Sequence, residues 1–207
     1  MTENFIDSIE CPKIPKSLPK KIPTDDALRL LEIIMNYPFT NNFLRYRNHA
    51  IFSTFIYTGL RRSELLNLKV MDVDIDNRTI FVSNGKGAKD RILPISHTLA
   101  GRLKKYIQER KKRNKTCPEF FASNNKNKGF TDSGLRHLTK ELKKVSKIQF
   151  TIHRLRHTFA TLMIEGGCDI YSLSKMMGHS DISTTTIYLS TTAEHLRGQI
   201  LKHPLNI

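Results

Sequence analysis

The stretch of residues 151–188 constrains the fold more strongly than any other part of the chain. Apolar residues recur over Ile152–Glu165 at the spacing of an amphipathic helix. Gly166 follows directly and predicts the end of that helix, and Gly178 predicts the end of a second, short helix over Asp169–Met177. This part of the chain therefore belongs to a mainly helical fold.

Polar side chains stand beside each of these helix ends. His153 and Arg156 lie about 60° apart on the helical wheel, so an imidazole and a cation share the edge of the apolar stripe. His179 directly follows the second helix, and Tyr188 is expected on a third helix. Any one of these residues alone is more often an ordinary surface or core residue, so the interpretation depends on the whole set and its order.

The rest of the chain predicts further helices and one small sheet. Helices are expected over residues 24–37, 41–57, 61–69, 96–113, 131–147 and 192–202, with Thr24 capping the first. Short strands are expected over residues 73–75, 79–82 and 91–94, with a hairpin turn at Asp76-Asn77 and a glycine-rich turn at residues 85–89. The predicted fold class is α+β, mainly α, with a small three-stranded antiparallel sheet and one core.

The chain divides into three parts by composition. Residues 1–23 are rich in proline and lysine and are expected to form an extended arm or linker. Residues 24–189 form one domain without an internal repeat, and residues 190–207 form a C-terminal tail.

The charge balance points to a polyanionic partner. Lysine and arginine total 34 against 19 aspartate and glutamate residues, a formal net charge of +15. Nucleic acid is the commonest partner of such a chain, and an anionic membrane surface is the other candidate. No apolar run approaches the ~20 residues of a spanning helix, and no signal peptide is visible. The three cysteines imply neither a disulfide framework nor a zinc–thiolate site, so we expect a cytoplasmic protein.

The polar residues at structural breaks contain no carboxylate. They are Arg61, Lys86, His153, Arg156, His179 and Tyr188. Guanidinium and imidazole donors suit a phosphodiester, because displacement at phosphorus builds negative charge on the oxygens that they bind. A tyrosine hydroxyl can be the nucleophile, nearby cations should favour its phenolate, and a lysine on a hairpin turn can protonate the leaving oxygen.

No metal or cofactor is expected. His153 and His157 have the spacing of a zinc helix, but the His-Glu-x-x-His pattern is absent and neighbouring arginines would repel a cation. The segment Gly85-Lys86-Gly87 lacks the remaining residues of a phosphate-binding P-loop.

Four segments resemble the tyrosine recombinase, or phage-integrase, family, and especially its Xer-type members. They are TGLRRSELLNL (58–68), NGKGAKDRILP (84–94), HRLRHTFAT (153–161) and GHSDISTTTIY (178–188). The resemblance implies a tyrosine-recombinase catalytic domain over residues 24–189. It assigns the two active-site arginines to Arg61 and Arg156, the hairpin lysine to Lys86, the histidines to His153 and His179, and the nucleophile to Tyr188.

This resemblance implies a site-specific DNA recombinase that performs integration, excision, inversion or resolution. Tyr188 would form a 3′-phosphotyrosyl link that the hydroxyl of a partner strand reverses, without metal, cofactor or ATP. Double-stranded DNA is the implied partner, four protomers would act together, and residues 190–207 could dock on a neighbouring protomer. Family members usually carry an N-terminal core-binding domain, whereas only the arm precedes Thr24 here, so we expect a naturally short member or a fragment.

Further DNA contacts are expected from residues beside these motifs. They are Arg62, Lys89, Arg91, Arg154 and Thr184, the last with its neighbours Thr185 and Thr186. Two other functions remain open, a type IB topoisomerase-like nicking and closing activity and a DNA-binding regulator that does not cut. The presence of Tyr188 and the arginine pair argues against the regulator, and an RNA-binding protein would be supported by charge alone.

Overall fold

A computed structural model describes residues 21–83, 90–179 and 181–188. The predictions for Lys86, Lys89, most of the arm and the C-terminal tail fall outside these residues. The helices are α1 (Thr24–Asn36), α2 (Asn42–Thr58), α3 (Arg62–Asn67), α4 (His97–Lys112), α5 (Asp132–Ser146), α6 (Ile152–Glu165), α7 (Ile170–Met177) and α8 (Ser183–Thr186). The strands are β1 (Val73–Asp74), β2 (Thr79–Val82) and β3 (Arg91–Pro94). The mainly helical α+β class is confirmed.

Polar side chains start several helices where the sequence predicts them. The Asn41 side-chain oxygen accepts a hydrogen bond from the backbone N–H of Leu44 at 3.0 Å, which satisfies a donor that the helix itself leaves unpaired. The same kind of cap is made by Ser96, Thr131 and Thr151. The prediction for Thr24 is wrong by one position, because Pro23 takes the cap position and makes no side-chain bond.

Helix α8 is shorter than expected. It ends at Thr186, so Tyr188 follows it on a turn and does not lie within a helix. The residues Ser183–Thr186 all carry hydroxyl groups, which bind nearby backbone groups and weaken a helix. The Thr186 hydroxyl, for example, donates to the Ser183 carbonyl at 2.8 Å.

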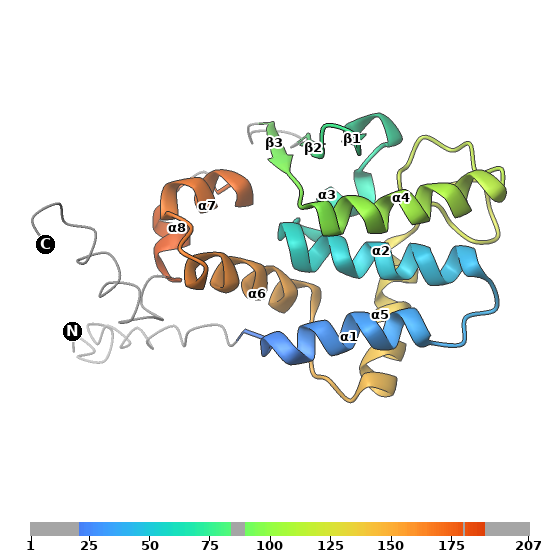
Figure 1. The fold of residues 1–207 in the computed structure, drawn as a ribbon, viewed down its shortest axis with the longest axis horizontal. Coiled ribbons are helices and arrows are strands. Elements are labelled where there is room, and N and C mark those ends of the chain that lie inside the picture. The colour runs from blue at the N-terminus through green and yellow to red at the C-terminus, as the bar shows by residue number, and fades with distance from the viewer. Residues whose placement is uncertain (1–20, 84–89, 180, 189–207) are drawn as a thin grey trace, which may run out of the picture.

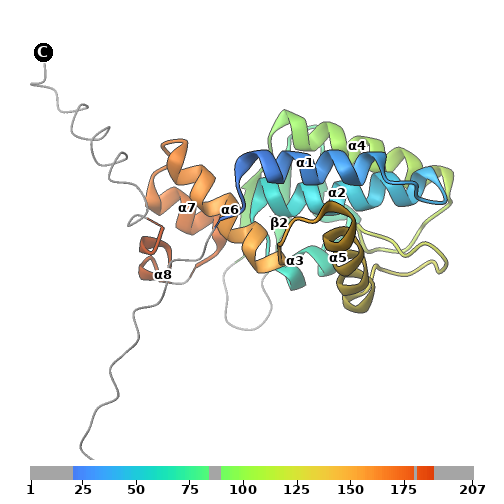
Figure 2. The same ribbon diagram turned by 90° about the horizontal axis from the view of Figure 1, so that it is seen from below.

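Helix α2 is the centre of the main core. Helices α1, α4 and α6 pack against it (Figure 1), and its side chains from Ala50 to Ile56 are buried. Helices α4 and α5 lie on opposite sides of α2 (Figure 2). The ring of Phe52 packs edge-on against Phe150, with ring centroids 5.8 Å apart, and this contact ties α2 to the segment that leads into α6.

The strands form the antiparallel meander that the sequence predicts, in the order β1-β2-β3. Ile80 and Leu93 are buried, whereas Phe81 and its cross-strand partner Ile92 are exposed. This alternation is typical of a sheet with one face on the core. Strand β3 contacts α7, so Arg91 at its start lies near the end of that helix.

The expectation of a single core needs correction. A second, smaller cluster of buried side chains forms where α6, α7 and the residues after α8 meet. It consists of Phe159, Ala160, Ile164, Leu173, Met177 and Tyr188. Helix α6 belongs to both clusters, because Leu155 packs into the main core. Among the described residues, no helix is both long and apolar enough to cross a membrane.

Candidate active site

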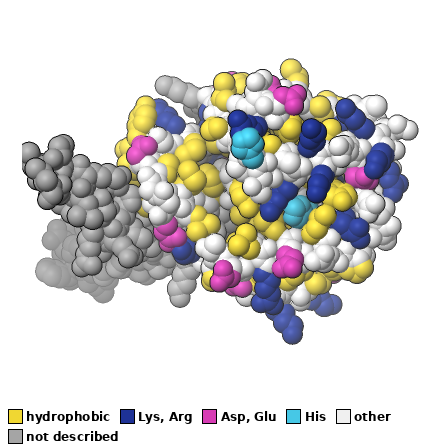
Figure 3. Space-filling model, viewed as in Figure 1, with side chains coloured by type: hydrophobic (Ala, Val, Ile, Leu, Met, Phe, Trp, Pro, Cys, Tyr) yellow, Lys and Arg dark blue, Asp and Glu magenta, His cyan; other side chains and the backbone are white. Residues whose placement is uncertain are grey.

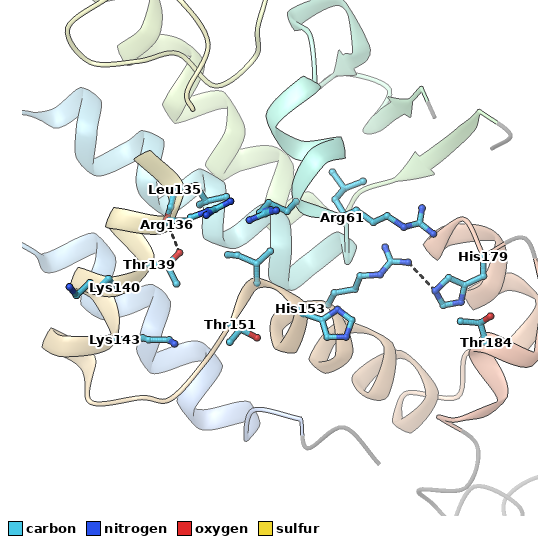
Figure 4. A pocket seen from close by; sticks show the side chains of 14 residues that line it. Arg61, Leu135, Arg136, Thr139, Lys140, Lys143, Thr151, His153, His179 and Thr184 are labelled. Atoms are coloured by element: carbon cyan, nitrogen blue, oxygen red, sulfur yellow. Dashed lines mark hydrogen bonds between the residues drawn. The ribbon is translucent and has the colours of Figure 1, made fainter. Parts of the chain in front are cut away.

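A pocket of about 670 Å³ lies between α3, α5, the start of α6 and the segment around α8 (Figure 4). Its basic lining residues are Arg61, Arg62, Arg136, Lys140, Lys143, His153, Arg156 and His179. No carboxylate is among the described residues that line it. The fold therefore brings Arg61, His153, Arg156 and His179 to one cavity, although they come from distant parts of the sequence.

Glu64 holds two arginines next to this pocket. Its carboxylate accepts hydrogen bonds from Arg61 Nη1 at 2.8 Å and from Arg91 Nη1 and Nη2 at 3.0 and 2.9 Å. Arg61 Nη2 also donates to the Gly178 carbonyl at 2.8 Å. Burial alone would raise the pKa of Glu64, but hydrogen bonds from Arg91 and Arg61 outweigh it and lower that pKa. Glu64 is therefore charged and fixes Arg61 against the end of α7.

Arg156 is held from both sides by backbone carbonyls. Its side chain is buried, and Nη1 donates to the Gly59 carbonyl at 2.5 Å while Nη2 donates to the Met177 carbonyl at 2.7 Å. Burial, and to a smaller extent Arg61, lower the pKa of Arg156 to about 10. The guanidinium still carries its charge at neutral pH, and its position is fixed by α2 and α7.

His179 follows Gly178, whose φ of 63° ends α7 in the left-handed conformation. Its Nε2 lies 3.0 Å from Arg156 Nη2, and its Nδ1 lies 2.7 Å from the Thr185 hydroxyl. Burial, with Arg156, lowers the pKa of His179 to about 4, so the imidazole is neutral at neutral pH. Thr185 is fully buried in this contact, which corrects the expectation that it contacts DNA.

Tyr188 lies in the second cluster, only 4% exposed, and does not line the pocket. Its hydroxyl oxygen lies 2.6 Å from His157 Nδ1, and His157 Nε2 lies 2.6 Å from His153 Nε2. The Arg156 cation favours the phenolate of Tyr188, as the sequence predicts, but it does not decide the pKa of that group. Burial raises the pKa of Tyr188 and outweighs the opposite effect of Arg156.

The other expected DNA contacts divide into two groups. Arg62 and Thr184 line the pocket, and Arg62 also pairs with Asp132 Oδ1 at 3.1 Å. Arg154 does not line it. Its guanidinium donates to the carbonyls of Gln149 and Lys21, at 2.8 and 3.3 Å.

The prediction that Arg91 contacts DNA needs correction. Its side chain is 9% exposed, and Nε donates to the Met176 carbonyl at 2.8 Å while both Nη atoms bind Glu64. This burial argues against a phosphate contact, because all of its donor atoms already bind acceptors of the protein. The structure gives Arg91 a positioning role, joining β3 to α7 through Glu64.

Several pocket and partner residues were not foreseen. Arg136, Lys140 and Lys143 extend the basic surface along α5, and their spacing on one helical face could have found them. On the face seen in Figure 3, Lys and Arg side chains are scattered among other side chains. Glu64 could have been found from the capping-box spacing after Arg61. No local pattern indicates the pairing of His157 with the tyrosine hydroxyl.

Comparison with known sequences gives a consistent result. The model of the phage integrase family matches residues 20–195. Tyrosine recombinase XerA of Thermococcus kodakarensis is 39% identical over 186 residues, which cover 90% of this chain and 63% of that protein. Tyrosine recombinase XerD of Listeria monocytogenes is 35% identical over 202 residues, covering 95% of this chain and 66% of the relative. The chain thus spans less than two thirds of the length of these relatives.

Solved structures agree with the sequence comparison. The crystal structure of XerA recombinase superposes with a TM-score of 0.76 at 34% identity, over 92% of this chain and 67% of that one. The XerH site-specific recombinase bound to palindromic difH substrate, a post-cleavage complex, gives a TM-score of 0.72 at 25% identity, over 89% and 53%. The catalytic domain of bacteriophage HP1 integrase, at 24% identity and a TM-score of 0.60, shares the fold over 89% of this chain and 95% of that one.

Proposed function

Because the chain belongs to the phage integrase family of tyrosine recombinases, we propose that it is a site-specific DNA recombinase. Tyr188 attacks a phosphodiester and leaves a 3′-phosphotyrosyl link and a free 5′-hydroxyl. The 5′-hydroxyl of a partner strand then attacks that link and rejoins the DNA. The number and type of phosphoester bonds are conserved, so the exchange consumes no ATP.

The observation that carries this proposal is the chemistry of the pocket. Six arginine and lysine side chains and no carboxylate are among the described residues that line it. Tyr188 connects to that lining through His157 and His153. Such a cavity suits a phosphodiester, because its donors bind the oxygens on which negative charge develops.

The two arginines retain donors for this purpose. A guanidinium has five N–H groups. The contacts described above use two side-chain donors of Arg61 and three of Arg156. The others can bind the non-bridging oxygens. His153 lines the same pocket and adds a contact, while His179 accepts from Arg156 Nη2 and helps to hold that guanidinium in place. We assign to Lys86 the proton that the leaving 5′ oxygen needs.

The proposed DNA path continues along α5. Figure 4 shows Arg136, Lys140 and Lys143 on this helix, beside the cavity that also holds Arg61 and His153. We propose that these side chains bind phosphates next to the cleaved bond and fix the register of the duplex. Arg62 and Thr184 line the same cavity and join this contact surface, and Lys89 is assigned to it from the sequence.

The proposal extends to the partners of the chain. The XerH relative is bound to a difH substrate in its crystal structure, and we propose double-stranded DNA as the substrate here. Residues 24–189 are the proposed catalytic domain, four protomers are proposed to act together on two sites, and residues 190–207 are proposed to dock on a neighbouring protomer. We propose that the chain works in the cytoplasm, where its DNA substrate lies.

Covalent trapping tests the proposed chemistry. The protein is incubated, with chelator present, with a nicked duplex that loses its 5′-hydroxyl fragment after cleavage. A denaturing gel should show a DNA-linked band with the wild-type chain and none with Tyr188→Phe, while both bind the duplex equally. Strand exchange between two labelled duplexes separates recombination from simple nicking and closing. The duplexes should come from the ends of the DNA element that encodes the protein. Binding to these duplexes without any covalent band would contradict the proposal.

A further inference from the structure

His157 is not among the residues that the motifs assign to catalysis, yet it touches the reacting atom. Its Nδ1 lies 2.6 Å from the Tyr188 hydroxyl, and its Nε2 lies 2.6 Å from His153 Nε2. The two imidazoles stand nearly perpendicular, with an interplanar angle of 84° and ring centroids 4.1 Å apart. Because His153 is exposed and lines the pocket, the two rings connect a buried hydroxyl with the cavity.

We propose that His157 is the immediate proton acceptor of the Tyr188 hydroxyl and passes a proton on to His153. The proposal rests on the function proposed above, since it concerns how the nucleophile of that reaction is activated. It assigns a catalytic role to His157, which contacts the reacting atom itself.

The environment of His157 favours its neutral imidazole ring, as a proton relay requires. Burial lowers the pKa of His157 to about 4, and the neighbouring His153 and Arg156 contribute to that decrease. The Nδ1 atom of His157 contacts Tyr188, and His179 lies close enough to interact with His157 electrostatically. At neutral pH the ring therefore carries one proton, so one of its nitrogens donates and the other accepts.

The donor and acceptor strengths of the two groups decide which of them donates the hydrogen bond between Tyr188 and His157. A phenol donates a hydrogen bond readily and accepts one poorly, whereas an unprotonated imidazole nitrogen is a strong acceptor. The Tyr188 hydroxyl thus donates to Nδ1 of His157, and the ring proton of His157 is on Nε2 and points at His153 Nε2. This tautomer is the one in which His157 is ready to receive the phenolic proton.

The proton and bond changes balance as follows. As the bond from the Tyr188 oxygen to phosphorus forms, the hydroxyl proton passes to Nδ1 of His157. The Nε2 proton of His157 passes at the same time to Nε2 of His153, which becomes an imidazolium at the edge of the pocket. The bond from phosphorus to the 5′ oxygen breaks, and that oxygen takes its proton from the general acid of the proposed function. The same steps in reverse return the protons on rejoining.

The need for such a relay follows from the burial of the nucleophile. Tyr188 is 4% exposed, so its proton cannot pass directly to bulk water. A positioned base contributes on the order of 100- to 10,000-fold to a proton-transfer step. The two rings supply an acceptor at the hydroxyl and an exit at the cavity.

The substitution His157→Asn tests this role. The asparagine oxygen can still accept a hydrogen bond near the position of Nδ1, but an amide cannot carry a proton onward. We expect the single-turnover rate of covalent trapping to fall by roughly 100- to 10,000-fold, with DNA affinity unchanged. The matched control is His49→Asn on α2, since His49 is a histidine of another helix whose pKa is also lowered to about 4 by burial, and it should cleave normally.

Fluorinated tyrosine at position 188 supplies a second test. It would not change the rate of the His157→Asn chain if His157 had only a structural role. Its phenol is more acidic and depends less on a base. We expect it to restore much of the rate in the His157→Asn chain and to change the wild-type rate little. A fast His157→Asn chain overturns the relay, while the Tyr188-dependent band of the wild type leaves the proposed function standing. If the His157→Asn chain cleaves faster than the wild type, the contact with His157 inhibits Tyr188, and this result also overturns the relay.

The wild-type protein offers a test that needs no variant. Nitrogen-15 NMR of the free chain reports which imidazole nitrogen carries the proton. The relay requires an unprotonated, hydrogen-bonded Nδ1 and a protonated Nε2 in His157, and the opposite tautomer overturns it even if the His157→Asn chain does not fold. If the wild-type chain forms no Tyr188-dependent adduct, the proposed function fails and the relay fails with it.

Discussion

Arg156 Nη2 lies 3.0 Å from His179 Nε2, and this contact determines the tautomer of the histidine. A guanidinium can only donate, so Nε2 must accept and the ring proton must be on Nδ1. That proton then points at the hydroxyl of Thr185, 2.7 Å away. A buried threonine thus holds the imidazole in the orientation in which it accepts from the arginine.

Thr185→Val should therefore impair catalysis without weakening DNA binding. The change keeps the shape of the side chain but leaves the Nδ1 proton of His179 without its acceptor, at a cost of about 1–3 kcal/mol. We expect the single-turnover cleavage rate to fall roughly tenfold. The control Thr98→Val alters an exposed threonine on α4 and should cleave normally. Equal rates for both variants would contradict this role of Thr185.

Glu64→Gln should destabilise the protein and slow cleavage. The Glu64 side chain is 5% exposed and binds Arg61 and Arg91. Removing its charge leaves two arginines with a neutral partner, and breaking a buried pair typically costs about 3–5 kcal/mol. Urea unfolding measures the loss. Glu165→Gln, which removes the charge from the more exposed pair with Lys21, should cost about 1 kcal/mol or less.

The lowered pKa of Glu64 also predicts how the free energy of unfolding depends on pH. The folded-state pKa of Glu64 is lower than its unfolded value, so its stabilisation is present above the unfolded pKa of roughly 4.3. It is lost as the pH falls through the lower, folded-state pKa. The Glu64→Gln chain should therefore lose less stability than the wild type below that pH, and parallel curves would rule out this contribution.

Buried histidines should dominate the pH dependence of stability at less acidic pH than Glu64 does. Burial lowers the pKa of His49, His157 and His179 to about 4. In the unfolded chain these histidines bind protons below roughly pH 6.5, whereas in the folded chain they stay neutral until about pH 4. Stability should thus fall between these two values as the pH is lowered. His49→Gln should flatten the curve of the urea midpoint against pH, and a wild-type midpoint that is constant from pH 7 to 5 would refute this account.

Gly178→Ala should disturb the site through the backbone. Gly178 has a φ of 63°, and an added Cβ would lie 2.7 Å from Arg91 Nη1. Arg91 is pinned by Glu64 and cannot move aside easily, and the left-handed backbone itself costs about 1–2 kcal/mol for other residues. The Gly178 carbonyl that holds Arg61 would shift, so both the melting temperature and the cleavage rate should drop.

Gly101→Ala is the matched control for this change. Gly101 lies within α4, and an added Cβ would meet nothing within 4 Å. An alanine there should be neutral or stabilise the chain by about 0.5–1 kcal/mol. If the two glycine variants melt alike, the close approach at Gly178 does not matter.

The paired change Lys140→Gln and Lys143→Gln tests the proposed DNA path on α5. For each lysine that binds a phosphate, its replacement should reduce the slope of log affinity against log salt by about 0.9. Fluorescence anisotropy across a salt series measures that slope, and the affinity should fall similarly for any duplex sequence. The control is Lys104→Gln with Lys105→Gln on the exposed side of α4. A slope that changes equally in both pairs would show general attraction instead of a path along α5.

Local patterns in the sequence were enough to predict much of this protein. The apolar spacing over Ile152–Glu165 and the glycine after it placed α6 with correct ends, and the meander was predicted from its turn residues. The set of candidate catalytic residues also came from short motifs, because each motif places its residue at a helix end or a turn. Such features depend on neighbours within a few residues, which the sequence displays directly.

Local sequence thus encodes the helices, the sheet and the candidate residues at their ends, whereas the packing of distant segments selects which of these groups become partners. Arg61 binds a carbonyl 117 residues away, and Arg91 turns from an expected phosphate ligand into a buried partner of Glu64. His157 meets the tyrosine hydroxyl only because α6 and the segment after α8 pack in a second cluster. The physical reason is that burial and hydrogen bonding depend on packing between distant segments, and no local spacing encodes that packing.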